Sequence, residues 1–496
     1  MKNQLAKWYF SQRMKAIEKW VKQPWKNQLS VLNYLIENGR QTEFGKNYDF
    51  NNIKNPETFQ QKIPLQDYET LKGYLTASIK GKQNQLWNKP IRWFAMSSGT
   101  TVDRSKYIPV TDESLQACHY RGGKDMLALY LNAHPKSQLF KGKSFALGGS
   151  RQMNALESGM YTGDISSIII SNLPSWAQYS RTPSKEITLM ADWNEKLEKL
   201  MTATASADIS SISGVPSWML VFLQSTAERY NKAIHQLWPN LEVFFHGGVG
   251  FSPYEQSFKT LIPDPKMNYW ETYNASEGFF GLQFSGKSKE LILLTNHSVF
   301  YEFVPIEHSH KTNPKTILLP EVEVGKTYEL IISTNAGLWR YRIGDTICFT
   351  STNPHLFTIS GRTKAFINIF GEELMIHNAE KALSMACTQT AAVITEYTAA
   401  PFYNETQKPV GHEWAIEFEK MPNNLAHFIR ILDESLCSLN SDYAAKRSYN
   451  LTMVLPKVKI LPKGTFQNWL SHKGKLGGQN KIPRLSNSRE FIEELL

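Results

Sequence analysis

The sequence predicts an α/β fold, with a large N-terminal domain of mostly parallel sheets and a β-rich subdomain, followed by a small α+β domain. From residue 91 onward, short apolar runs alternate with longer stretches of helical periodicity, which is typical of parallel strands covered by helices on both faces. The chain has 496 residues, and a single hydrophobic core rarely serves more than about 300. We therefore expect two domains, at 1–362 and 363–496.

The elements of the N-terminal domain follow in order along the chain. Residues 1–80 should be mostly helical, because Met14, Ile17 and Val21 recur at helical spacing. A strand should end at Met96. Helices are then expected near 112–131, near 186–203 and from Pro216, and strands at 144–147, 209–213, 241–248 and 267–273.

The rest of the chain divides into two regions. Residues 290–360 contain short apolar runs separated by turn residues, and these predict the β-rich subdomain. After Arg362 the alternation returns on a smaller scale, which predicts the α+β domain. Its strands are expected near 365–370, 391–396 and 412–418, and its helices near 377–387 and 423–439.

Composition and charge narrow the class of protein. Hydrophobic residues make up 41% of the chain and charged residues 20%, which is typical of a globular enzyme. The net charge of +10 is spread without a run of five or six like charges, which favours a solvated surface over binding to nucleic acid or membrane. The four cysteines form no CxxC pair, and the N-terminus lacks the apolar core of a secretory signal. We expect a cytoplasmic protein.

One loop is rich in hydroxyl groups and directly follows a strand-like run. Donors grouped around a glycine can bind a phosphate group, and the glycine lets the backbone approach the anion closely. An ordinary polar loop is the alternative, since Ser, Gly and Thr are common in loops. The loop consists of Ser97, Ser98, Gly99, Thr100 and Thr101.

Two further loops follow strand-like runs, HGGVG at 246–250 and YNASEG at 273–278. Ligands bind beyond the carboxyl ends of parallel strands, so we expect these loops and the hydroxyl loop to open onto one crevice. YRIGD at 341–345 adds a carboxylate at a glycine turn, although such an Asp is often only a local cap. The Walker phosphate motif, GxSxG and HExxH are absent from the sequence, and no GxGxxG follows the early strands.

The chain resembles the adenylate-forming superfamily in an ordered set of motifs: SSGTT, HGGVG, YNASEG, LWRYRIGD and GRTKAFINIFGEEL, followed by Glu380. Within that superfamily it is most similar to the Gretchen Hagen family of auxin-responsive acyl acid amido synthetases. Flanking segments carry the resemblance over nearly the whole chain, among them TEFGKNYDF, FALGGS, LDESL and NKIPR. Thr101, Asn274 and Ala275 depart from the family pattern.

The resemblance implies an ATP-dependent ligase that uses Mg²⁺. Such an enzyme activates a small carboxylic acid as an acyl-adenylate and then transfers the acyl group to an amino acid, forming an amide. An acyl-CoA ligase shares the first step and is one alternative. A nucleotide- or nucleic-acid-binding protein without ligase activity is another. The acid, the amine acceptor and the oligomeric state do not follow from the sequence.

The resemblance also implies residues that bind the nucleotide. The β- and γ-phosphates would be held by the hydroxyl loop, from Ser97 to Thr101. Gly247 and Gly248 would let the backbone approach adenine, and Tyr273 would pack on the ring. Further roles fall on four residues: Ser276 near the phosphates, Glu277 there and on Mg²⁺, and Asp345 and Arg362 at the ribose hydroxyls.

Two lysines receive roles from the resemblance as well. Lys364 would be the hinge about which the small domain turns. Lys481, in NKIPR, would stabilise negative charge on the reacting α-phosphate. Four apolar side chains could line the acyl pocket, although core packing is favoured for most of them: Trp218, Met219, Phe222 and Phe251.

Overall fold

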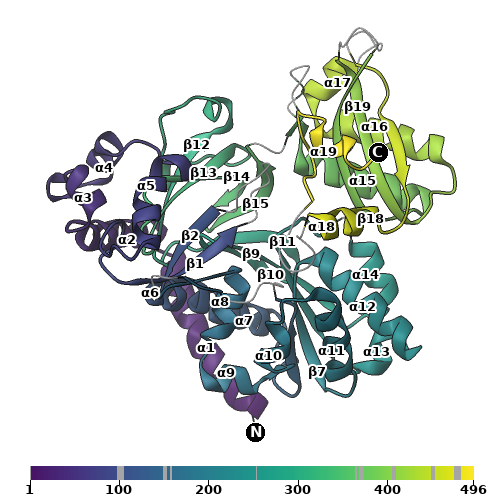
Figure 1. The fold of residues 1–496 in the computed structure, drawn as a ribbon, viewed down its shortest axis with the longest axis horizontal. Helices are drawn as coiled ribbons and strands as arrows, with labels where there is room; N and C mark the ends of the chain where they lie inside the picture. The colour runs from purple at the N-terminus through teal and green to yellow at the C-terminus, as the bar shows by residue number, and fades with distance from the viewer. Residues whose placement is uncertain are drawn as a thin grey trace. The chain divides into compact units, whose positions relative to one another are not determined.

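The computed structural model confirms the α/β class, with a large sheet in one part of the chain and a smaller α+β part at the C-terminus (Figure 1). It forms two compact units: Met1–Gly214 with His235–Gly248 and Lys266–Thr358, and Val215–Ile234 with Val249–Pro265 and Ile359–Leu496. The second unit thus includes two segments from within 1–362, and the boundary expected after residue 362 stays a proposal. The structure describes residues 2–97, 106–148, 154–156, 159–252, 254–363, 366–367, 372, 374–404, 409–447, 453–473 and 482–496.

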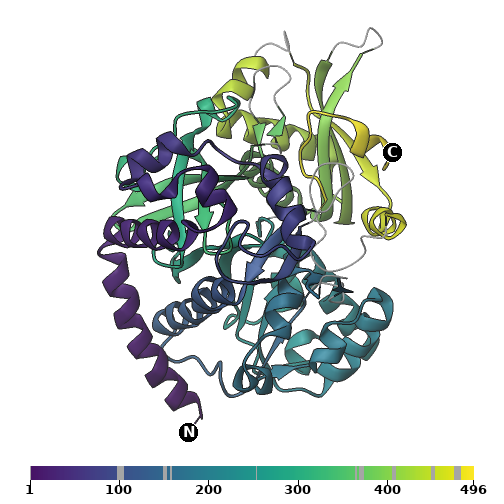
Figure 2. The same ribbon diagram turned by 60° about the vertical axis from the view of Figure 1, so that its left-hand side comes forward.

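The N-terminal helices confirm the expectation for residues 1–80, and local signals explain where several of them begin. Thr42 and Asn55 accept hydrogen bonds from backbone N–H groups three residues later, and Asp67 and Thr70 form a capping box. Figure 2 shows α1 as the long purple helix that begins beside the N-terminus. The helices are α1 (Lys2–Val21), α2 (Pro24–Gly39), α3 (Glu43–Asn47), α4 (Pro56–Lys62) and α5 (Tyr68–Ile79).

A four-stranded sheet comes next, in the order β2-β1-β5-β4. The strand expected to end at Met96 is β1, which continues for one more residue. It pairs antiparallel with β2 and parallel with β5. The bounds are β1 (Ile91–Ser97), β2 (Lys106–Thr111), β4 (Asn154–Ala155) and β5 (Tyr161–Gly163).

The large sheet has eleven strands in the order β12-β13-β14-β15-β11-β10-β9-β8-β7-β3-β6. One half is parallel: β3 (Lys143–Ala146), β6 (Arg181–Thr182), β7 (Ile209–Gly214), β8 (Val243–Gly247) and β9 (Asn268–Ala275). The strands of the other half are β10 (Gly278–Ser285), β11 (Ser288–Leu293), β12 (Val299–Pro305), β13 (Thr327–Thr334), β14 (Tyr341–Thr352) and β15 (His355–Arg362).

The two halves join at a tight hairpin between β9 and β10, where Ala275 pairs with Gly278. A two-residue connection returns the chain beside the strand it has just left, so the strands that follow extend the same sheet in antiparallel pairs. The strands expected at 290–360 are therefore present. They continue the large sheet and do not form a separate one.

Helices of the first unit lie near the parallel strands (Figure 1). The helix expected at 112–131 is interrupted by a π-helical turn, η2 (Leu115–Tyr120). The helix expected at 186–203 is two helices, because Asp192 caps a new start by accepting from the Glu195 N–H. The bounds are α6 (Asp112–Ser114), α7 (Arg121–Ala133), α8 (Ile165–Ser171), α9 (Ser175–Tyr179), α10 (Lys185–Thr188) and α11 (Trp193–Ala205).

The second unit contains α12 (Pro216–Tyr230) and α14 (Glu255–Leu261) together with the C-terminal α+β elements. There the sheet β18-β19-β20 shares one hydrophobic core with α15 and α16. The helices expected in this region and the strands expected near 391–396 and 412–418 are present. Of the strand expected near 365–370, the described residues Phe366–Ile367 form β16. Their bounds are β16 (Phe366–Ile367), β17 (Leu374–Met375), α15 (Ile376–Thr390), β18 (Val393–Tyr403), β19 (Pro409–Lys420), α16 (Leu425–Leu439), α17 (Ser441–Arg447), β20 (Lys457–Leu461), α18 (Thr465–His472) and α19 (Glu490–Glu493).

Candidate active site

The carboxyl ends of β8 and β9 lie side by side, since the strands are parallel and Gly247 pairs with Thr272. A Cβ atom on Gly247 would overlap the carbonyl oxygen of Thr272. Gly248 has a φ of 86°, in the left-handed region that favours glycine. Gly247 and Gly248 of HGGVG are thus required by the local backbone, and neither places a side chain after β8.

Tyr273 and Asp345 meet across the sheet from positions 72 residues apart. The Tyr273 hydroxyl donates a hydrogen bond to Asp345 Oδ2 at 2.6 Å, and both residues are buried. The Tyr273 ring packs edge-on against Phe280 and Phe357, with centroids 5.1 and 6.2 Å away. A carboxylate held by a buried phenol has a defined orientation, as recognition of a diol requires. Tyr273, which is expected to pack on adenine, thus also orients the Asp345 carboxylate.

Ser276 and Glu277 form the two-residue turn of the β9–β10 hairpin. Both are partly buried. The loop expected after the strand is therefore as short as a hairpin allows, and it holds the Glu277 backbone at the end of β9. Within the described residues there is no group of three or more His, Cys, Asp or Glu side chains placed to hold a metal. A metal at Glu277 would need ligands from a substrate or water, which suits Mg²⁺.

The π-helical turn η2 contributes two buried residues that the sequence did not single out. Cys118 Sγ accepts a hydrogen bond from the Phe279 N–H at 3.1 Å, and His119 Nδ1 lies 3.1 Å from Asn274 Oδ1. Burial lowers the pKa of His119 to about 4, so the ring is neutral at pH 7 and Nδ1–H donates to the amide oxygen. Together these contacts pin the hairpin that carries Ser276 and Glu277. A π-helical turn has no periodic signature, so sequence patterns could not have found it.

Several residues implied by the resemblance lie outside the described residues: Ser98, Gly99, Thr100, Thr101, Lys364 and Lys481. The backbone of Ser97 is described, and it ends β1 opposite Lys106 of β2. The hydroxyl loop therefore joins two antiparallel strands of the four-stranded sheet. The expectation that the three loops open onto one crevice stays a prediction. HGGVG and YNASEG follow the adjacent parallel strands β8 and β9 of the large sheet, whereas β1 belongs to the four-stranded sheet.

The other implied residues belong to the second unit. Arg362 ends β15 and is partly buried, next to Gly361 with a φ of 145°. The apolar candidates for an acyl pocket are all less than one-tenth exposed, which is consistent with the core packing favoured for most of them. They are Trp218, Met219 and Phe222 on α12, and Phe251.

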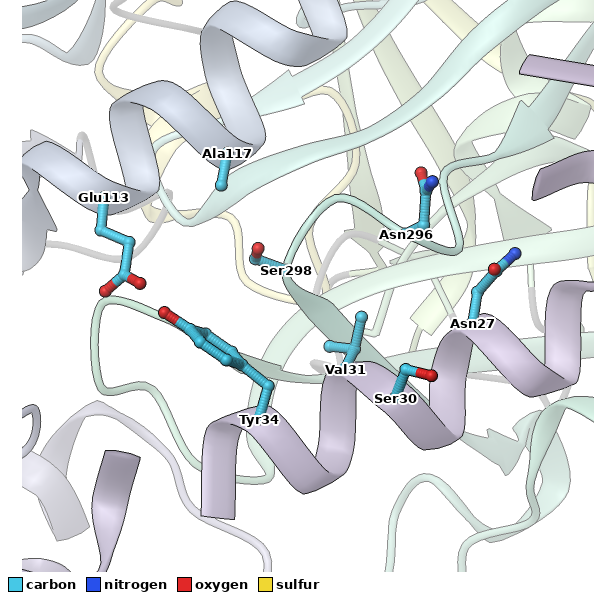
Figure 3. A pocket seen from close by; sticks show the side chains of 8 residues that line it. All are labelled: Asn27, Ser30, Val31, Tyr34, Glu113, Ala117, Asn296 and Ser298. Carbon is cyan, nitrogen blue, oxygen red and sulfur yellow. The ribbon is translucent and has the colours of Figure 1, made fainter. Parts of the chain in front are cut away.

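A separate hollow of about 330 Å³ lies in the first unit between α2, the α6–η2 segment and residues 296–298 (Figure 3). Figure 3 shows the hydroxyl end of Tyr34 directed toward Glu113. The Trp87 indole N–H donates to Glu113 Oε2 at 2.9 Å, and burial raises the pKa of this carboxyl. None of the implied residues that the structure describes lines the hollow. The candidate site is therefore the edge formed by β8, β9 and β14.

Family comparisons cover most of the chain. Residues 13–267 match the GH3 family N-terminal domain, residues 292–362 the GH3 family central domain, and residues 377–490 the GH3 family C-terminal domain. Indole-3-acetic acid-amido synthetase GH3.4 of Arabidopsis thaliana is 24% identical, over 95% of this chain and 91% of the relative. Jasmonoyl-L-amino acid synthetase JAR6 of Nicotiana attenuata is 23% identical, over 92% and 90%.

Solved structures share the fold. The acyl acid amido synthetase GH3.15 aligns with a TM-score of 0.80 at 18% identity, over 97% of this chain and 95% of that one. A 2-hydroxyisobutyryl-CoA ligase aligns with a TM-score of 0.60 at 13% identity, over 98% and 91%. At these identities the likeness concerns the fold alone. The N-terminal domain match by itself spans more than half of the sequence, from residue 13 to 267 of 496, and the chain therefore belongs to the GH3 family.

Proposed function

We propose that this protein is an ATP-dependent acyl acid amido synthetase. In the first step, a carboxylate oxygen of a small apolar or aromatic acid attacks the α-phosphorus of ATP, and pyrophosphate leaves. In the second, the amine nitrogen of an amino acid attacks the acyl carbon, loses a proton, and displaces AMP to leave an amide. The adenylate is needed because oxide is a poor leaving group and AMP is a good one.

The observation that carries the proposal is the Tyr273–Asp345 hydrogen bond at the end of the parallel strands, in a chain of the GH3 family. Asp345 would accept hydrogen bonds from the ribose hydroxyls, and the backbone at Gly247 and Gly248 would lie against adenine. The names of the relatives support the same reaction class, because they are amido synthetases for indole-3-acetic acid and for jasmonate.

The residues present fit Mg²⁺. Glu277 supplies one carboxylate at the turn after β9, and Mg²⁺ is usually bound through one or two carboxylates together with substrate phosphates. When bound, the ion would neutralise charge on the departing pyrophosphate. The hydroxyl loop from Ser97 to Thr101 would hold the β- and γ-phosphates, and Lys481 would stabilise charge at the α-phosphate.

The test is pyrophosphate exchange into ATP against a library of carboxylic acids, with and without Mg²⁺. At least one acid should drive exchange well above background, and Asp345→Asn should raise the ATP concentration needed for half-maximal exchange. Arg92→Met is the matched control, because Arg92 lies on the exposed surface in a pair with Asp112. Folded protein that binds ATP but exchanges no pyrophosphate with any acid would contradict the proposal.

A second experiment identifies the molecule that accepts the acyl group. An acid that drives exchange is incubated with ATP and either a panel of amino acids or CoA, and the product is identified by mass. An amide is expected. A thioester alone would make the protein an acyl-CoA ligase, a class that shares this fold.

We also propose a cytoplasmic location. Cys118, Cys348, Cys387 and Cys437 all lie in the described part of the chain and are free thiols, which suits a reducing compartment. Among the described helices, none combines the length and the apolar character needed to cross a membrane.

A further inference from the structure

The chain directly after Lys481 is attached to β18 by an isolated parallel β-bridge, in which Leu485 lies opposite Ala399. Three hydrogen bonds of 2.6 to 3.1 Å make the attachment: Thr398 Oγ1 to Pro483 O, Ala399 N to Arg484 O, and Ser486 N to Ala399 O. Residues 482–486, which directly follow Lys481 in the sequence, are thus fixed to β18.

The Arg484 side chain makes three kinds of contact: an ion pair, a hydrogen bond and a cation–π contact. Its guanidinium, 7% exposed, pairs with the Glu396 carboxylate on β18 and donates to the Tyr254 hydroxyl. It also lies over the Tyr397 ring, 4.6 Å from the centroid. Tyr254 belongs to the segment 249–265 of the same compact unit, and its own hydroxyl is 3.4 Å from Glu396 Oε2.

The charges of Arg484 and of the carboxyl groups near it fix the orientation of the guanidinium. Glu396 is buried and Glu380 is partly buried near the guanidinium, whose positive charge lowers the pKa of each carboxyl against the larger effect of burial. Arg484 itself remains charged, because Glu396 holds its pKa above the usual value against burial. An apolar residue could fill the same space but could not fix the orientation, since a planar guanidinium accepts partners only in defined directions.

We propose that Arg484 is a positioning residue for Lys481, and that it acts by holding residues 482–486 in register with β18 and against Tyr254. The inference rests on the proposed function, in which Lys481 stabilises the α-phosphate during adenylation. A lysine has four rotatable side-chain bonds, so its reach to a reacting atom depends on where its backbone is anchored. Displacements of about 1 Å can reduce a rate by roughly 10²-fold.

The experiment compares Arg484→Met, Arg484→Lys and Lys481→Ala, alone and combined, by pyrophosphate exchange in the full-length protein. Arg484→Met should lower kcat for exchange by about 10- to 100-fold, with the KM for ATP nearly unchanged, because the proposed nucleotide contacts lie on other segments. Arg484→Lys should recover part of the loss, since an ammonium can pair with Glu396 but cannot also reach Tyr254.

The decisive comparison is the double variant. If Arg484 acts through Lys481, then Arg484→Met should cause little further loss in a Lys481→Ala protein. Equal losses in both backgrounds would show a merely structural role and would overturn the inference. Should Arg484→Met fail to fold, Tyr254→Phe removes only one hydroxyl partner and must show a smaller loss with the same dependence on Lys481.

Arg489→Met is the matched control. Arg489 lies in the same C-terminal segment and is also tied to the sheet, through Glu413 Oε2 at 2.8 Å and Pro401 O at 2.8 Å. Its exchange kcat should stay within twofold of the wild type. If the wild type exchanges no pyrophosphate with any acid, the proposed function has failed. If the wild type exchanges and Arg484→Met matches it, only the positioning role has failed.

Discussion

At the scale of single residues, Tyr273 illustrates how one hydroxyl can prepare a site. Its ring is buried against two phenylalanines, and its hydroxyl donates a hydrogen bond to Asp345. The strand pattern of MNYWETY correctly predicts β9, and the motif resemblance indicates that Tyr273 and Asp345 both serve the nucleotide. Their contact with each other depends on the register of a sheet whose strand order is not sequential, which no local pattern specifies.

Tyr273→Phe should weaken ATP binding. The variant removes the donor to Asp345 and leaves the ring in place, so the carboxylate loses one orienting hydrogen bond, worth about 1 to 3 kcal/mol when the acceptor is charged. The Kd for ATP, measured by calorimetric titration, should rise roughly 5- to 150-fold by that energy. Tyr301→Phe is the control, because this buried hydroxyl donates to a backbone carbonyl, Leu294 O, at 3.4 Å and not to a carboxylate of the proposed site. An unchanged Kd for Tyr273→Phe would remove the tyrosine from the site.

Glu380 should make stability depend on pH. Burial raises the pKa of this carboxyl in the folded protein to about 7 from its ordinary value of 4.5. Between these values the folded state binds more protons than the unfolded state, so the free energy of unfolding falls as pH rises through this window. In Glu380→Gln the free energy of unfolding should fall less steeply over this pH range. Measured against the wild type, the stability of the variant should therefore be higher at pH 8 than at pH 4.5 by on the order of 1 to 3 kcal/mol.

Urea unfolding of wild type and Glu380→Gln at several pH values from 4.5 to 8 measures this difference. Glu434→Gln serves as the control, since the Glu434 side chain is 62% exposed on α16 of the same unit. Parallel pH profiles for wild type and Glu380→Gln would show that the carboxyl titrates normally.

At the scale of elements, the side chain of a buried arginine in the first unit joins β12 to the end of α4. Arg340 has a φ of 42° and pairs with Glu302 of β12 at 2.9 and 3.0 Å. The same guanidinium donates to Gln60 O and Thr316 Oγ1 at 2.7 and 2.8 Å. The sequence correctly predicts strands in LWRYRIGD and VFYEFV, but the partner of Arg340 follows from β13 lying between those strands.

Arg340→Met should destabilise the first unit by roughly 3 to 5 kcal/mol, because it leaves the Glu302 carboxylate buried without its cation. Thermal unfolding followed by calorimetry gives the change. Arg92→Met removes an arginine whose pair with Asp112 is exposed, and it should cost less than about 1 kcal/mol. Similar losses in the two variants would contradict the assignment of a buried network.

At the scale of the whole molecule, the chain forms two units whose boundaries are discontinuous in sequence. Gly247, Gly248, Tyr273 and Asp345 all lie in the first, while Arg484 and its partners lie in the second. The sequence predicts two domains but places the segments 215–234 and 249–265 in the first of them. Their grouping with the C-terminal residues depends on contacts between distant parts of the chain.

Scanning calorimetry should therefore show two transitions that respond differently to ligands. Adenosine lacks the phosphates, so at ten times its Kd it should stabilise mainly the first unit, by about 1.4 kcal/mol. Arg340→Met identifies the transition of the first unit by lowering it. An adenosine effect confined to the other transition would contradict the placement of the nucleotide site.

The sequence by itself determined the α/β class, the position of most elements and the order of the motifs. Those features depend on periodicity, capping residues and turn chemistry, all of which act between residues close in the chain. Only the tertiary structure decided that Tyr273 holds Asp345, that η2 pins the β9–β10 hairpin, and that Arg484 meets Tyr254 and Glu396. Such contacts join residues separated by 72 to 230 positions. They arise from strand order and close packing, which no single segment specifies.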